Sequence, residues 1–72
     1  MPINDLLKRR GIGPEDSKRL KQAFALAVKG LYLVDRSDPI CAIVANKVLE
    51  IGLNGTRDPE AIAALTIRQL AP

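Results

Sequence analysis

The chain has 72 residues and a net charge of +3, and 47% of its residues are hydrophobic, although one Phe and one Tyr are its only aromatic side chains. A chain this short forms a single domain, residues 1–72, whose core must be built from Leu, Ile, Val and Ala. With no His and one Cys, the sequence excludes an internal disulfide and a Cys/His metal site, so we expect no metal and no cofactor.

Apolar stretches in this sequence are short. Lys29 and the pair Asn46-Lys47 interrupt them, and none approaches the ~20 residues that a membrane-spanning helix needs. Charged residues also occupy positions 5 and 8–10, where a secretory signal would be apolar. We therefore expect a soluble, cytoplasmic protein that makes no contact with a membrane.

Helices are predicted throughout, because no segment alternates strictly between polar and apolar residues as a strand would. The first helix is short, residues 3–9, and Gly11 ends it. The second covers residues 14–34, with Pro14 at its first position, where the missing N–H of proline leaves no bond unmade. Gly30 inside this helix indicates close packing or a slight bend.

Two Asp-Pro pairs mark the starts of the remaining helices. Asp38-Pro39 begins a third helix over residues 39–51, and Asp58-Pro59 begins a fourth over residues 59–70. The Asp side chain can accept a bond from a first-turn N–H, and Pro suits the first helical position. The third helix is expected to end at Gly52 and Asn54-Gly55, which tolerate a left-handed backbone. Short connections favour antiparallel neighbours, so we predict an all-α fold, a small bundle of four helices.

Helical periodicity separates core from solvent faces. On the second helix the apolar stripe contains Leu20, Ala23, Phe24, Ala27, Val28, Leu31 and Val34. Most of the circumference of the third helix is apolar, including Ile40 and Ala42. We therefore expect this helix to be covered on most sides and to lie at the centre. Three large side chains fall outside these core stripes and are the candidate contacts with a protein partner: Leu26, Leu33 and Ile43.

The turn Gly11-Ile12-Gly13-Pro14, followed by Ser17 and Leu20, resembles that of the helix-hairpin-helix DNA-binding family. In that family a Gly-hydrophobic-Gly loop offers backbone N–H groups to a phosphate, and the resemblance, over about ten residues, implies such a contact here. The alternative interpretation is purely structural: Gly11 ends one helix, and Gly13 with Pro14 begins the next.

Basic residues concentrate in the first half of the chain. Residues 1–37 hold eight Lys/Arg against four Asp/Glu, whereas residues 38–72 hold three against four. A basic patch at the first turn is typical of a weak nucleic-acid binder, with candidate contacts at Lys8, Arg9, Arg10, Lys18, Arg19 and Lys21. The alternative is a solvated helix face, since no aromatic side chain accompanies these residues for base stacking.

The sequence contains no obvious candidates for catalytic residues. The acidic groups Glu15, Asp16, Asp38, Asp58 and Glu60 all lie at predicted helix starts, where they have a structural role. Cys41 is on the apolar side of the third helix, which favours inert packing. We therefore predict no catalytic residues and no enzyme activity.

The segment 34–70, with Asp-Pro-Ile-Cys and Arg-Asp-Pro-Glu as landmarks, is similar to small bacterial helical proteins without an assigned activity, and the likeness implies a helical fold. From the residues themselves, the surplus of apolar surface predicts a non-enzymatic helical interaction module, a homo-oligomer or the binder of a protein partner. The alternative is a weak nucleic-acid-binding module that uses the basic N-terminal half.

Overall fold

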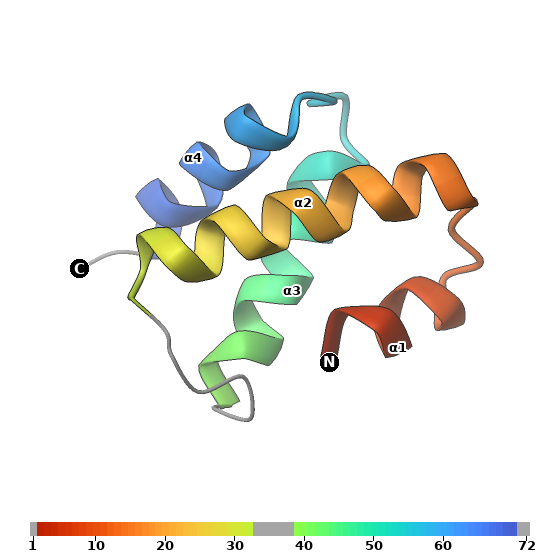
Figure 1. Cartoon of the computed structure of the whole chain (residues 1–72), viewed down its shortest axis with the longest axis horizontal. Helices are drawn as coiled ribbons and strands as arrows, with labels where there is room; N and C mark the ends of the chain where they lie inside the picture. Colours follow the sequence, from red (N-terminus) through yellow and green to blue (C-terminus); the bar gives the residue numbers. More distant parts are fainter. Residues whose placement is uncertain (1, 33–38, 71–72) are drawn as a thin grey trace.

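The computed structural model describes residues 2–32 and 39–70, which form four α-helices joined by turns (Figure 1). These are α1 (Pro2–Arg9), α2 (Pro14–Gly30), α3 (Pro39–Gly52) and α4 (Pro59–Leu70). The predicted all-α fold with a short first helix is confirmed, α1 having eight residues. Asp38, which was predicted to cap α3, and Leu33 and Val34 lie outside the described residues.

Two helices share the centre of the bundle. α2 and α3 each contact all three other helices, whereas no described residue of α1 contacts α4. Figure 1 shows α2 crossing in front of α3, with α4 along one side of α2 and α1 along the other. The predicted central position of α3 is therefore shared with α2, whose most extensive packing is against α4.

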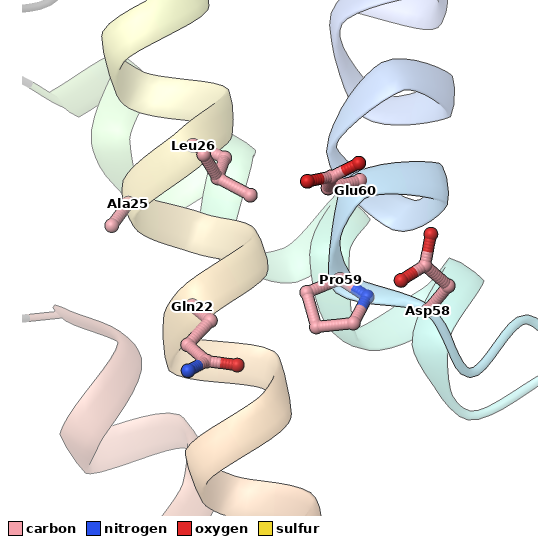
Figure 2. A pocket seen from close by; sticks show the side chains of 6 residues that line it. All are labelled: Gln22, Ala25, Leu26, Asp58, Pro59 and Glu60. Carbon is pink, nitrogen blue, oxygen red and sulfur yellow. The ribbon is translucent and has the colours of Figure 1, made fainter.

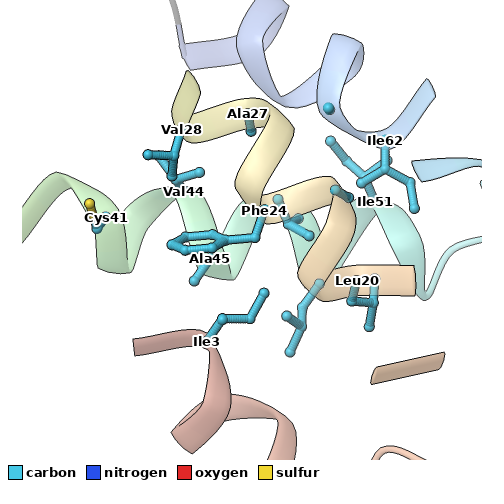
Figure 3. Packing of buried hydrophobic residues seen from close by; sticks show 14 of the residues in the cluster. Ile3, Leu20, Phe24, Ala27, Val28, Cys41, Val44, Ala45, Ile51 and Ile62 are labelled. Carbon is cyan, nitrogen blue, oxygen red and sulfur yellow. The ribbon is translucent and has the colours of Figure 1, made fainter. Parts of the chain in front are cut away.

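The core is a single cluster to which every helix contributes (Figure 3). Its largest fully buried side chain is Phe24, and α1 adds Ile3 and Leu7. The stripe predicted on α2 is buried from Leu20 to Val28, while Leu31 is partly buried beside it. Small residues such as Ala23 and Ala27 fill the rest of this face, which lets the neighbouring helices approach closely.

Gly11 ends α1 as predicted, through a Schellman motif. Its φ of +64° places it in the left-handed region, where the N–H of Gly11 donates to the Lys8 carbonyl (3.1 Å) and that of Ile12 to the Leu7 carbonyl (3.1 Å). Both bonds satisfy carbonyls that the helix end would otherwise leave without partners. Ile12 packs against the core cluster, which completes the motif.

The predicted end of the second helix at residue 34 is wrong, because α2 stops at Gly30. Tyr32 adopts a left-handed backbone with a φ of +59°, and its N–H donates to the Lys29 carbonyl at 3.1 Å. This geometry closes a helix and cannot continue it. The sequence hid this stop, since Tyr is not a residue that usually takes a positive φ.

The structure requires a glycine at position 52 for a different reason from the one predicted. Gly52 is the last residue of α3, but the described glycines with positive φ are Gly11 and Gly55. A Cβ on Gly52 would overlap Cδ2 of Leu20 and lie 3.3 Å from Cδ1 of Ile62. Gly52 is therefore needed for the close approach of α2, α3 and α4, and the left-handed turn falls on Gly55.

Asp58 caps α4 as predicted. Its Oδ2 accepts a hydrogen bond from the Ala61 N–H at 3.2 Å, and its carbonyl accepts the N–H of Ile62 at 2.9 Å. Thr66 of α4 is fully buried, and its hydroxyl donates to the Ile62 carbonyl at 2.7 Å. That bond satisfies the only polar group that Thr66 brings into the core.

Candidate functional site

An open groove of about 470 Å³ runs between α2 and the start of α4 (Figure 2). Six residues line it, three from each side: Gln22, Ala25, Leu26, Asp58, Pro59 and Glu60. The Asp58 cap fixes the start of α4. Further along, Gly30 lies so close to Ile67 that a Cβ would overlap its side chain. The groove is thus held between two helices that pack tightly.

The floor of the groove is apolar and its edge is acidic. Leu26 is 41% exposed, and with Ala25 and Pro59 it offers carbon surface to the outside. Glu60 is exposed and adds a carboxylate, and the Asp58 carboxylate uses one oxygen for the Ala61 N–H. Such a surface suits a partner that brings an aliphatic side chain and a positive charge together.

The predicted partner contacts do not gather in one place. Leu26 lies in the groove, whereas Ile43 is 54% exposed on the outer face of α3 and does not line the groove. Leu33 lies outside the described residues. The structure therefore separates Leu26 from Ile43, two residues that the sequence grouped only because each falls outside a core stripe.

α3 is less covered than predicted. Ile40 and Ala42 were assigned to the covered side, but both are exposed. The buried face of α3 runs through Cys41, Val44 and Val48, while Ile40, Ala42 and Ile43 are exposed. Sequence periodicity could not show this, because a residue at the flank of an apolar stripe is buried only if a neighbour reaches it.

The basic residues are split between two elements and two sides of α2. Lys8, Arg9 and Arg10 are exposed at the end of α1, and Lys18 and Lys21 are exposed on α2. Arg19 is partly buried, and its Nη1 binds Oδ1 of Asp16 at 2.6 Å. Since residues two positions apart point to opposite sides of a helix, Arg19 and Lys21 do not share a face.

The glycine turn between α1 and α2 has the helix-end geometry predicted by the structural interpretation. Gly13 is extended and is the N-cap of α2, and its carbonyl accepts the Ser17 N–H at 2.8 Å. The Ser17 hydroxyl donates to the Ile12 carbonyl at 3.3 Å, which fixes the turn against the helix. A phosphate contact at this turn stays a prediction, and Glu15 and Asp16 put negative charge beside it.

The residues at the start of α4 were missed as site residues. In the sequence, Asp58, Pro59 and Glu60 are fully explained as a helix start. Only the packing of α4 beside α2 shows that they also border Leu26. Over residues 2–32 and 39–70, no cluster of three or more His, Cys, Asp or Glu is placed to hold a metal ion. No helix in those ranges is both long and apolar enough to cross a membrane.

Comparison with known proteins gives no match: no family model, no curated protein and no solved structure matches this chain.

Proposed function

We propose that the protein is a non-enzymatic helical module that associates with a second copy of itself through the groove between α2 and α4. The observation that carries the proposal is the half-exposed Leu26, set between Ala25 and Pro59 beneath an acidic edge. A large aliphatic side chain in a concave site is typical of a contact surface. The single Cys suits a reducing compartment, so we place this association in the cytoplasm.

The energy available from this surface is modest. At about 25 cal/mol per Å², burying a few hundred Å² of apolar surface contributes several kcal/mol. Association must offset a loss of translational and rotational freedom of at least about 4 kcal/mol. Subtracting this cost leaves a few kcal/mol, which corresponds to a weak dimer with a dissociation constant in the millimolar range, about −4 kcal/mol.

Sedimentation equilibrium over a wide concentration range tests the proposal, with Leu26→Asp and Ile43→Asp as a matched pair of variants. Both positions carry a large, exposed aliphatic side chain, so neither substitution disturbs the core. We expect Leu26→Asp to weaken dimerisation by about tenfold or more, since it removes the apolar contact and adds a carboxylate beside Asp58 and Glu60, and Ile43→Asp to leave it unchanged.

Two results would contradict the proposal. A wild-type protein that is monomeric at every concentration removes self-association altogether. A dimer that is dissociated by Ile43→Asp and insensitive to Leu26→Asp moves the contact from the groove to the outer face of α3.

A second candidate function, weak binding of nucleic acid, rests on Lys8, Arg9 and Arg10. All three are exposed in succession at the end of α1, beside a turn where Gly11 and Gly13 have open space around them. Phosphate contacts from such a cluster carry no sequence information and weaken steeply with salt.

Fluorescence anisotropy with a labelled single-stranded and a labelled duplex oligonucleotide tests this candidate at low and physiological salt. The triple variant of Lys8, Arg9 and Arg10 to Ala should lose binding to all sequences equally. The control replaces three exposed basic residues elsewhere, Lys29, Arg57 and Arg68, and removes the same charge. Equal loss in both variants would show a response to net charge only, and no binding at low salt ends this candidate.

A further inference from the structure

We infer that the second copy docks with its α2 antiparallel to the first α2, about a two-fold axis that passes beside Gln22. The inference rests on the proposed self-association and specifies its geometry. The evidence lies in the outer face of α2, in the charges along it, and in the groove beside it.

The outer face of α2 is a continuous exposed strip along a helix of 17 residues. Its members recur at spacings of three and four, as neighbours on one helix face do, and all are exposed: Glu15, Lys18, Gln22, Ala25, Leu26 and Lys29. Gln22 stands at its middle, with Glu15 and Lys29 at equal sequence distance on either side. A two-fold axis at Gln22 therefore brings the whole strip into one contact.

The charges on this strip select the antiparallel orientation. In that orientation Glu15 of each copy faces Lys29 of the other, which gives two opposite-charge pairs related by symmetry. A parallel arrangement would instead place Glu15 against Glu15 and Lys29 against Lys29, and like charges in contact are unfavourable. Within residues 2–32 and 39–70, neither Glu15 nor Lys29 is engaged in an ion pair, so both are available.

The groove adds a second complementary contact. In the antiparallel register Lys18 of the second copy lies at the level of Leu26 along the helix. The edge of that groove carries Asp58 and Glu60 (Figure 2). The aliphatic stem of Lys18 can cover Leu26 while its charged end reaches the carboxylates. Lys18 of the second copy thus brings both an apolar stem and a positive charge to the groove, which has an apolar floor and an acidic edge.

The geometry sets a distance that can be measured. Packed helices have axes about 8–10 Å apart, and each Cα lies about 2.3 Å from its own axis. The two Gln22 Cα atoms, facing each other at the two-fold axis, are then about 3.5–5.5 Å apart, and a disulfide can span the upper part of this range. The native Cys41 is fully buried in the core and does not compete.

The first test is disulfide cross-linking of Gln22→Cys under mild oxidation, measured on a non-reducing gel. The matched control is Gln69→Cys, an exposed Gln on α4 that is not on the strip. We expect Gln22→Cys to cross-link at least about tenfold faster than Gln69→Cys at the same protein concentration. Equal rates for the two variants would overturn the antiparallel register.

The second test is charge reversal, measured as the dimer dissociation constant by sedimentation. Glu15→Lys or Lys29→Glu alone should weaken the dimer about tenfold, because each places like charges at two symmetric contacts, whereas the double variant should restore it. The control is Asp5→Lys, an exposed acidic residue in the first turn of α1. A similar effect of Asp5→Lys, or no recovery in the double variant, contradicts the pairing.

The tests separate the register from the proposed function. If the wild type forms a dimer, but the cross-linking rate does not depend on the cysteine position and the charge reversals do not change the dissociation constant, self-association stands and the antiparallel register is wrong. A monomeric wild type at every concentration overturns both.

Discussion

Gly52 at the end of α3 lies against the side chain of Leu20 from α2, at a point where no Cβ can be placed. A Cβ built there would overlap Cδ2 of Leu20 and lie 3.3 Å from Cδ1 of Ile62 on α4. Leu20 and Ile62 are both fully buried. Three helices therefore meet around a residue without a side chain, and both neighbouring side chains are enclosed in the core.

Gly52→Ala should lower the free energy of unfolding by about 1–3 kcal/mol, because the added methyl forces Leu20 out of its packed position. Urea denaturation followed by circular dichroism measures this change. If the variant is as stable as the wild type, Leu20 and Ile62 can repack and the contact is not as tight as described.

Gly30→Ala is the matched comparison, and we expect it to stay within about 1 kcal/mol of the wild type. Its Cβ would overlap Cδ1 of Ile67 and lie 3.3 Å from Cγ1, but Ile67 is only partly buried and its end can rotate away. The better helix propensity of Ala also offsets part of the strain. A loss equal to that of Gly52→Ala, in the same urea titration, would show that Ile67 is fixed.

Tyr32→Gly should raise the free energy of unfolding by about 0.5–1 kcal/mol, since it relieves a left-handed backbone that glycine adopts without strain. Tyr32 has a φ of +59° and is 90% exposed, so its removal takes away little packing. Tyr32→Ala is the control, because Ala keeps the Cβ and the strain. Equal thermal midpoints for the Gly and Ala variants would mean that the backbone conformation is not the cause.

Asp58→Ala should destabilise the protein by about 1 kcal/mol through loss of the cap on α4. Its Oδ2 accepts the Ala61 N–H at 3.2 Å, a bond that an Asn side chain can replace. Asp58→Asn should therefore remain close to wild type in thermal unfolding. If Asn is as destabilising as Ala, the negative charge at the helix start matters more than the hydrogen bond.

The fold follows from the sequence to a large extent, because its signals are local. Pro14 and Pro59 mark helix starts, Gly11 marks an end, and the stripe from Leu20 to Val28 marks the core face. The errors arise where tertiary packing decides. Tyr32 ends α2 although it is no usual stop residue, and Gly52 serves close packing where a left-handed turn was expected.

The candidate site was half predictable. Leu26 stands out from periodicity alone, because it lies beside the core stripe of its own helix. Its grouping with Ile43 had no structural basis, since the two residues lie on different helices and only Leu26 lines the groove. Nothing in sequence spacing could place Pro59 and Glu60 beside Leu26, because that neighbourhood depends on how α4 packs against α2.

α1 is held to the rest of the protein by Ile3 and Leu7 in the core and by Leu6 packed against it, and no described residue of α1 contacts α4. In Figure 3 Ile3 extends from α1 toward Phe24. Local opening therefore has an obvious starting point: the amide hydrogens of α1 should exchange with solvent sooner than those of α2 and α3. Detachment of α1 would expose Phe24 to solvent. The protein would then transiently present apolar core surface on a face other than the groove.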